Sequence, residues 1–249
     1  VGILLCLWVL IINRWAVRSS QWVFAAVLLL LLFYQPLLGM WTVTLKLHPS
    51  IVSQHLLSGM SLMVLIALQW MYFSTNVSQS EPIKRVRLLR VGGVVLIVLL
   101  YFQLLLGVWT STNYAALSCD SFPFCHVDHW SYAFKEAFNF LRPLGQNYSG
   151  GVASENARRT IQVVHRFGAL AVATGLLLWV SCILTTVRSL RLLLLSLVAG
   201  MLLLLQVVLG ITVVYFSQPL LIALLHTLTA SGLLLAVVAL NFQIWSSKD

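Results

Sequence analysis

Three histidines stand inside long apolar stretches of the sequence: His55, His165 and His226. Histidine is costly inside a membrane, so it usually has a function there or packs against a neighbouring helix. Zinc would require four donors, commonly including Cys or a carboxylate, and no Asp or Glu lies inside these stretches. Neutral imidazoles from facing helices suit haem iron, which they bind without burying further charge. These residues therefore predict haem ligands, with helix packing as the alternative.

The propionate groups of a haem need cations or water around them. Arg166 adjoins His165, and Arg158 and Arg159 lie just before it in the sequence. These three arginines are our candidates for propionate partners. The alternative is that their long side chains reach out to the membrane interface without contacting a ligand.

A polar segment between the apolar stretches carries Cys119 and Cys125 in a C-x5-C arrangement. On an oxidising side of a membrane, a disulfide is the favoured interpretation. Zinc binding together with His126 and His129 is an alternative, although this spacing matches no common zinc site. A redox-active pair is a third alternative. Four neighbouring residues predict an ordered cap over the bundle: Phe122, Pro123, Phe124 and Trp130.

The composition predicts which secondary-structure elements position these residues. Hydrophobic residues make up 60% of the 249 residues and charged residues only 8%, which excludes an ordinary soluble domain. Several apolar runs reach about 20 residues, the length of a membrane-spanning helix. We predict spans at 1–13, 22–45, 50–73, 88–111, 159–187, 191–216 and 219–245. The fold class is thus an all-α, polytopic membrane bundle, and each histidine lies about six residues into its helix from one end.

The formal net charge of +9 does not indicate nucleic acid as a partner, because basic residues in short loops set orientation in a membrane. Nine of them fall on one side of the bundle: Arg14, Arg18, Lys84, Arg85, Arg87, Arg90, Arg188, Arg191 and Lys248. That side, with the C-terminus, is predicted to be cytoplasmic. The loop 112–158 then faces the periplasm, and the protein lies in the cell inner membrane.

An internal repeat divides the chain. Gln206, Gly210 and His226 each lie 171 positions after Gln35, Gly39 and His55. A shared offset of this kind predicts two related four-helix units. Residues 75–249 form a complete unit, and 1–74 form the last part of another. By the same offset, the counterpart of His165 falls before Val1, so we expect the first unit to be incomplete and its first helix to be cut.

Longer motifs resemble one family. The stretches LLGVWTSTNYAALSCDSFPFC, IQVVHRFGAL and QHLLSG, in their order along the chain, resemble the haem A synthase family. The resemblance implies an eight-helix membrane oxidoreductase of two similar halves that oxidises the C8 methyl group of haem O to a formyl group, giving haem A. It implies a haem B cofactor held by His165 and His226 as axial ligands for electron transfer, haem O bound through His55, and a disulfide between Cys119 and Cys125.

One departure from the family concerns a catalytic Glu that lies three residues before the first histidine. The repeat puts Gln162 at that place in the second half, and the Glu itself upstream of Val1. We therefore expect the chain as written to be inactive, while the full-length protein is an enzyme. The partners that the resemblance implies are haem O and the bilayer; haem O synthase, cytochrome oxidase and a second copy of the chain are candidates.

Two other functions fit the same histidines. A bis-His cytochrome b would pass electrons between quinone and a periplasmic partner, and would need no carboxylate near the first histidine. A haem carrier or transporter would expose rings of aromatic side chains at an outer platform, of which the segment around Trp130 offers little.

Overall fold

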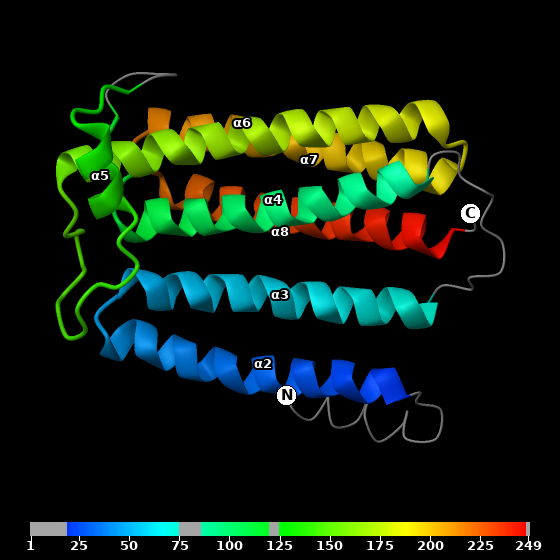
Figure 1. The fold of residues 1–249 in the computed structure, drawn as a ribbon, viewed down its shortest axis with the longest axis horizontal. Coiled ribbons are helices and arrows are strands. Elements are labelled where there is room, and N and C mark those ends of the chain that lie inside the picture. The colour runs from blue at the N-terminus through cyan, green and yellow to red at the C-terminus, as the bar shows by residue number, and fades with distance from the viewer. Residues whose placement is uncertain (1–18, 75–85, 120–124, 248–249) are drawn as a thin grey trace.

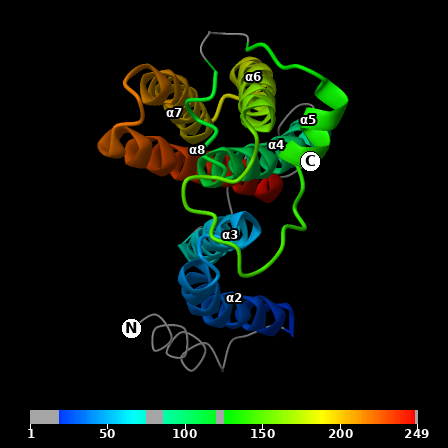
Figure 2. The ribbon, with the colours of Figure 1, turned by 90° about the vertical axis from the view of Figure 1, so that its left-hand side faces the viewer.

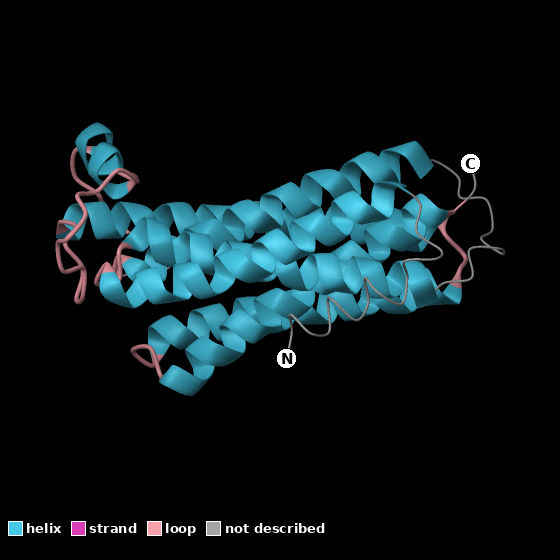
Figure 3. Ribbon diagram, turned by 90° about the horizontal axis from the view of Figure 1, so that it is seen from below, coloured by secondary structure: helices cyan, strands magenta, loops and turns pink. Residues whose placement is uncertain are grey.

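The computed structural model describes residues 19–74, 86–119 and 125–247. These residues form seven helices and, within those ranges, no strand (Figure 3). The helices are α2 (Ser19–Thr44), α3 (Pro49–Ser74), α4 (Val86–Thr112), α5 (Trp130–Ala137), α6 (Glu155–Thr186), α7 (Leu190–Tyr215) and α8 (Leu220–Ser246). The predicted span 1–13 lies outside the described residues.

Six of these helices, all except α5, are long and apolar enough to cross a membrane, with 22 to 32 residues each. They lie side by side along the long axis of the molecule (Figure 1). Helices satisfy every backbone polar group internally, which is what a hydrocarbon environment requires. The prediction of an all-α, polytopic membrane bundle is confirmed.

Four helices form a ring in which each packs on two neighbours: α4 on α6, α6 on α7, α7 on α8 and α8 on α4. The end-on view shows α6 and α8 at opposite corners of this ring (Figure 2). Helix α3 packs against α4 and α8, and α2 packs against α3. The α2–α3 hairpin therefore lies beside the ring.

The connections alternate between the two ends of the bundle. Residues 113–119 and 125–154, which include α5, lie at one end together with the turns that join α2 to α3 and α7 to α8 (Figure 1). We call this the loop end.

The tightly packed core lies toward the opposite end. Its buried residues include Leu89, Leu176, Ile183, Leu240 and Ile244. Toward the loop end the packing changes: α7 buries no residue beyond Leu203, and α8 buries none before Thr229. The loop-end halves of these two helices thus leave their side chains partly exposed, whereas their other halves hold the bundle together.

The segment 125–154 contacts both the ring and the hairpin. Trp109 of α4 donates its indole N–H to the carbonyl oxygen of Ala137, at 2.8 Å. On the hairpin, Ser50 donates to the carbonyl oxygen of Phe140 at 2.7 Å. The ring of His48 packs edge-on against Tyr148, with centroids 5.0 Å apart. This segment therefore joins the two parts of the molecule at the loop end.

Two features of this end differ from the sequence-based expectation. Helix α5 was not predicted, because eight residues are too few to show a clear period in the sequence. Helix α6 begins at Glu155, four residues before its predicted start at 159. The cause is a cap: the Ser154 hydroxyl accepts a hydrogen bond from the backbone N–H of Ala157, which satisfies a free donor of the first turn.

Candidate functional site

The three membrane histidines lie toward the loop ends of three different helices. His55 is six residues after the start of α3, and His226 is six after the start of α8. His165 is ten residues after the start of α6, so the expectation of six residues for all three was wrong for this one. The reason is the extra first turn that Ser154 caps.

The clearest contact at His165 comes from the neighbouring helix α4. The side-chain amide nitrogen of Gln103 lies 3.0 Å from Nδ1 of His165 and 3.1 Å from its backbone oxygen. One turn along α4, a methyl group added to Gly107 would lie 3.4 Å from Cε1 of the same ring. The imidazole thus lies against the backbone at Gly107, with Gln103 holding one edge.

A similar arrangement recurs between α7 and α8, but the glutamine reaches the other ring nitrogen of the histidine. The amide nitrogen of Gln206 lies 3.2 Å from Nε2 of His226. A methyl group added to Gly210 would lie 3.1 Å from Cε1 of that ring. We call this arrangement a Gln-Gly cradle. In each cradle the Gln lies four residues before the Gly on one helix, and the His lies on a helix that packs against it.

The third cradle, between α2 and α3, differs in one contact. Gly39 lies beneath the ring of His55, where a methyl group would be 3.5 Å from Cε1. The amide nitrogen of Gln35, however, donates to the backbone oxygen of His55 at 3.2 Å and to the hydroxyl of Ser58 at 2.9 Å. The imidazole of His55 makes no hydrogen bond with the described residues, and its Nδ1 is buried without a partner.

Sequence reasoning missed these glutamines as neighbours of the histidines. The signal was present, because Q-x3-G occurs at Gln35, Gln103 and Gln206, each on the helix before a histidine. We used this repeat to divide the chain and not to infer contacts.

His165 and His226 lie on the two helices at opposite corners of the ring, α6 and α8. His55 lies on α3, outside the ring. Helix α6 has no buried residue between Val163 and Val172, the stretch that contains His165.

The donor set around this pair fits haem. Both rings are held from one side by a glutamine, Nδ1 of His226 is buried without a partner, and glycines let the ring edges approach the backbone closely. Among the described residues there is no group of three or more His, Cys, Asp and Glu that could hold a metal ion. Two imidazoles on different helices of the ring, in apolar surroundings, match an iron porphyrin, which brings its own four nitrogen ligands.

The arginine candidates separate into two kinds. Arg159 donates to the carboxylate of Glu155 at 2.5 Å and to the backbone oxygen of Ser118 at 3.2 Å. It therefore anchors the loop. Arg158 lies two helical turns from His165 on nearly the same face, about 10 Å toward the loop end, and its Nε is buried without a partner. Arg166 is half-buried beside His165. Arg158 and Arg166 remain the candidates for propionate partners.

Gln162 lies one turn from His165, toward the loop end and on nearly the same face of α6. Its side chain is only 4% exposed, and its Oε1 has no hydrogen-bond partner. A neutral amide at this place can accept or donate a hydrogen bond, but it cannot act as a carboxylate base.

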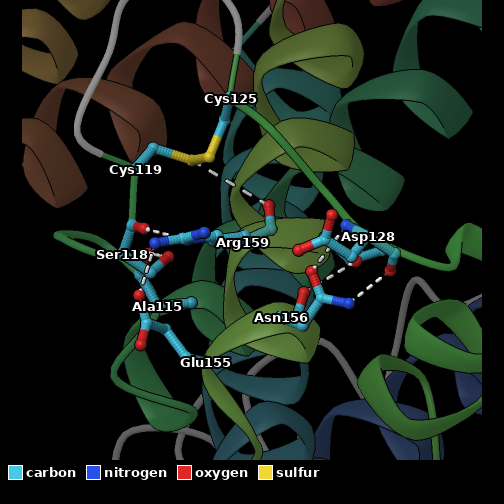
Figure 4. The surroundings of a disulfide bond; sticks show 9 residues. Ala115, Ser118, Cys119, Cys125, Asp128, Glu155, Asn156 and Arg159 are labelled. Atoms are coloured by element: carbon cyan, nitrogen blue, oxygen red, sulfur yellow. Dashed lines mark hydrogen bonds and ion pairs between the residues drawn. A yellow bond between two sulfur atoms is a disulfide. The ribbon is translucent and has the colours of Figure 1, made fainter.

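Cys119 and Cys125 form a disulfide, with Cα atoms 5.4 Å apart (Figure 4). The bond lies beside the first turns of α6, where the guanidinium of Arg159 reaches Ser118. Its sulfurs are bonded to each other, so they do not form a zinc site with His126 and His129. The nearby His126 is 84% exposed and pairs with Asp128 instead. Of the predicted cap, Trp130 begins α5, whereas Phe122, Pro123 and Phe124 lie outside the described residues.

Farther along the loop, Arg142 is partly covered where it meets the α2–α3 turn. Burial lowers the pKa of its guanidinium, while the nearby Tyr148 and Glu136 raise it. His48 in that turn lies with Nε2 3.2 Å from the backbone oxygen of Arg142.

Comparison with known proteins adds an independent finding. The model of a family described as cytochrome oxidase assembly protein matches residues 1–238. A protein of Shewanella oneidensis described as heme A synthase is 36% identical over 259 residues, an alignment that covers 99% of this chain and 73% of the relative.

Proposed function

Since the chain belongs to the haem A synthase family, we propose that its reaction is the oxidation of the C8 methyl group of haem O to a formyl group, with a bis-His haem B as cofactor. The enzyme is a multi-pass membrane oxidoreductase of haem A biosynthesis. Two hydroxylations of the methyl carbon followed by loss of water give the formyl group.

The single observation that carries the cofactor proposal is the pair of cradles at opposite corners of one four-helix ring. His165 and His226 each have a glutamine at one ring edge and a glycine beneath Cε1. Histidines on α6 and α8 would hold a haem inside the ring, since sites in helix bundles are built from side chains on facing helices. Among the described residues, no other histidine has a glutamine at a ring nitrogen.

Haem bound there would supply the electron transfer that no side chain can perform. The chain itself contributes three things. His165 and His226 would hold the haem iron between them, and a haem held by two histidines favours electron transfer over binding of oxygen. Gln103 and Gln206 fix the orientation of the rings. Arg158 and Arg166 offer positive charge for the propionates.

We assign haem O to the hairpin side, through His55. In this proposal 1–74 belong to the substrate half and 75–249 to the cofactor half. The recurrence of the cradle in α2–α3 supports a related site there. The absence of a ring hydrogen bond suits a ligand that must accept and release a molecule in every turnover.

The proposed setting is the cell inner membrane, with residues 112–158 in the periplasm and the C-terminus in the cytoplasm. The basic residues Arg87, Arg90, Arg188 and Arg191 at the end opposite the loop support this orientation. Haem O synthase, as the source of the substrate, and cytochrome oxidase, as the recipient of the product, are the expected partners.

The test is pigment analysis of the full-length protein purified from membranes. Haem B, with traces of haem O and haem A, is expected. His165→Ala and His226→Ala should each lose the haem B spectrum, while His55→Ala keeps it and loses bound haem O. A haem B spectrum that survives in all three variants would end the ligand assignment. Haem B without any haem O or haem A, in a protein that passes electrons from quinol, would indicate a cytochrome b instead.

A further inference from the structure

At the end of the bundle opposite the loop, α4 and α8 enclose a surface groove of about 400 Å³. Its lining consists of Arg87, Arg90, Val91, Val94, Val95 and Trp245. We propose that this groove binds one anionic phospholipid, with the headgroup phosphate at the two arginines and an acyl chain along the valines.

The two arginines occupy one end of the groove in different ways. Arg90 donates to the backbone oxygen of Ser247 at 3.0 Å, and its guanidinium lies 5.3 Å from the centroid of the Trp245 ring. Arg87 is exposed and makes no hydrogen bond or ion pair with the described residues. One guanidinium is thus fixed in place, and the other can close over a phosphate.

Charge complementarity identifies the occupant as an anion. The carboxylates that the structure describes, Asp128, Glu136 and Glu155, all lie at the loop end. Glu81, Asp120 and Asp249 lie outside the described residues. The described part of the groove therefore carries positive charge next to the membrane surface, where basic pockets between helices bind anionic headgroups.

The apolar part of the groove identifies the anion as a lipid. Val91 and Val94 line the groove after Arg87 on one face of α4, and Val98 continues this face beyond the groove. The three valines are 47% to 63% exposed. This strip extends about 16 Å from Arg87 toward the membrane centre, given the helix rise of roughly 1.5 Å per residue. Trp245, at 56% exposure, borders it at the level where aromatic side chains meet headgroups. A free phosphate would use only the arginine end.

The test compares lipid retention in two charge-matched variants of the full-length protein. Arg87→Gln removes a charge inside the groove, and Arg191→Gln removes an exposed charge at the same end of the bundle on α7. In native mass spectrometry with added phosphatidylglycerol, the wild type and Arg191→Gln should retain one lipid. Arg87→Gln should bind about fivefold more weakly, the effect of one basic residue near an anionic surface.

A third variant, Val94→Trp, fills the groove and keeps both arginines, and should weaken lipid binding as well. Equal losses in Arg87→Gln and Arg191→Gln would overturn the proposal in favour of general attraction to the membrane. Equal retention of phosphatidylcholine, or complete displacement of the lipid by inorganic phosphate, would also overturn it. Because the arginines lie far from the histidines along the helices, pigment content serves as the folding control.

Discussion

The Gln-Gly cradles of the four-helix ring and of the α2–α3 hairpin share a backbone design and differ at the imidazole. In the ring, Gln103 and Gln206 reach ring nitrogens of His165 and His226 at 3.0 and 3.2 Å. In the hairpin, Gln35 bonds to Ser58 and to the backbone, and the ring of His55 is left without a hydrogen bond among the described residues.

This difference indicates how one motif can bind a permanent cofactor in one place and a substrate in another. A hydrogen bond to the far nitrogen of a ligating histidine fixes ring orientation and strengthens the ligand, often by 10- to 100-fold in metal affinity. A cofactor that stays bound is held more tightly because of that bond. A substrate that must leave is released more readily without it. If the glutamine bonded to the imidazole causes this difference in binding, its removal should weaken the binding of haem in the ring and leave the hairpin site unchanged.

The largest effect is expected from Gly168→Ala on α6. The added methyl group would overlap the side-chain amide of Gln103 and would also crowd Leu106. Gln103 must then leave His165, and overpacking of this kind costs about 1–3 kcal/mol. We expect a lower midpoint of thermal unfolding and loss of most of the haem B spectrum. Gly200→Ala is the control, since nothing lies within 4 Å of its added methyl group. Equal behaviour of the two variants would contradict the argument.

Replacing the glutamines themselves should separate the two sites more cleanly. Gln103→Leu and Gln206→Leu keep side-chain volume but remove the bond to the ring. The rate of haem B transfer to excess apomyoglobin should rise by about 10- to 100-fold in both.

Gln35→Leu is the matched control for that experiment, because its amide does not contact a ring nitrogen. Its haem B transfer rate should stay at the wild-type value. If all three variants release haem B at the same rate, the glutamines stabilise only the helix pairs, and the comparison between ring and hairpin loses its basis.

The two regions also differ in how the segment 125–154 is attached to them. Trp109→Phe would leave the Ala137 carbonyl oxygen without its donor in a buried place, at a cost of about 1–3 kcal/mol. Ser50→Ala breaks an exposed bond to Phe140, at a cost of at most about 0.5–1.5 kcal/mol. Hydrogen exchange should therefore show faster opening of α5 in the first variant and only local change near Phe140 in the second. The reverse order would mean that the loop is held mainly by the hairpin.

Most of the membrane helices could be predicted from the sequence. The features that could not be predicted were missed for physical reasons. Long apolar runs determine membrane helices with little ambiguity, so the six described spans were found within a few residues. The start of α6 was missed because a polar cap at Ser154 extends the helix beyond the apolar stretch. The roles of Gln103 and Arg159 were missed because they depend on which side chains meet across helices, and one sequence does not state that.

The smallest predicted effect addresses why Gln35 avoids the ring of His55. Its amide is held by the hydroxyl of Ser58, which in turn donates to the backbone oxygen of Gln54 at 2.6 Å. Ser58→Ala removes this partner, and Gln35 should then turn toward the imidazole, as its counterparts do. Dissociation of bound haem O should slow by about two- to threefold, the value of one weak hydrogen bond. Ser61→Ala is the control, because its hydroxyl bonds only to Leu57 in its own helix. An unchanged or faster dissociation in Ser58→Ala would show that Ser58 does not keep the hairpin site loose.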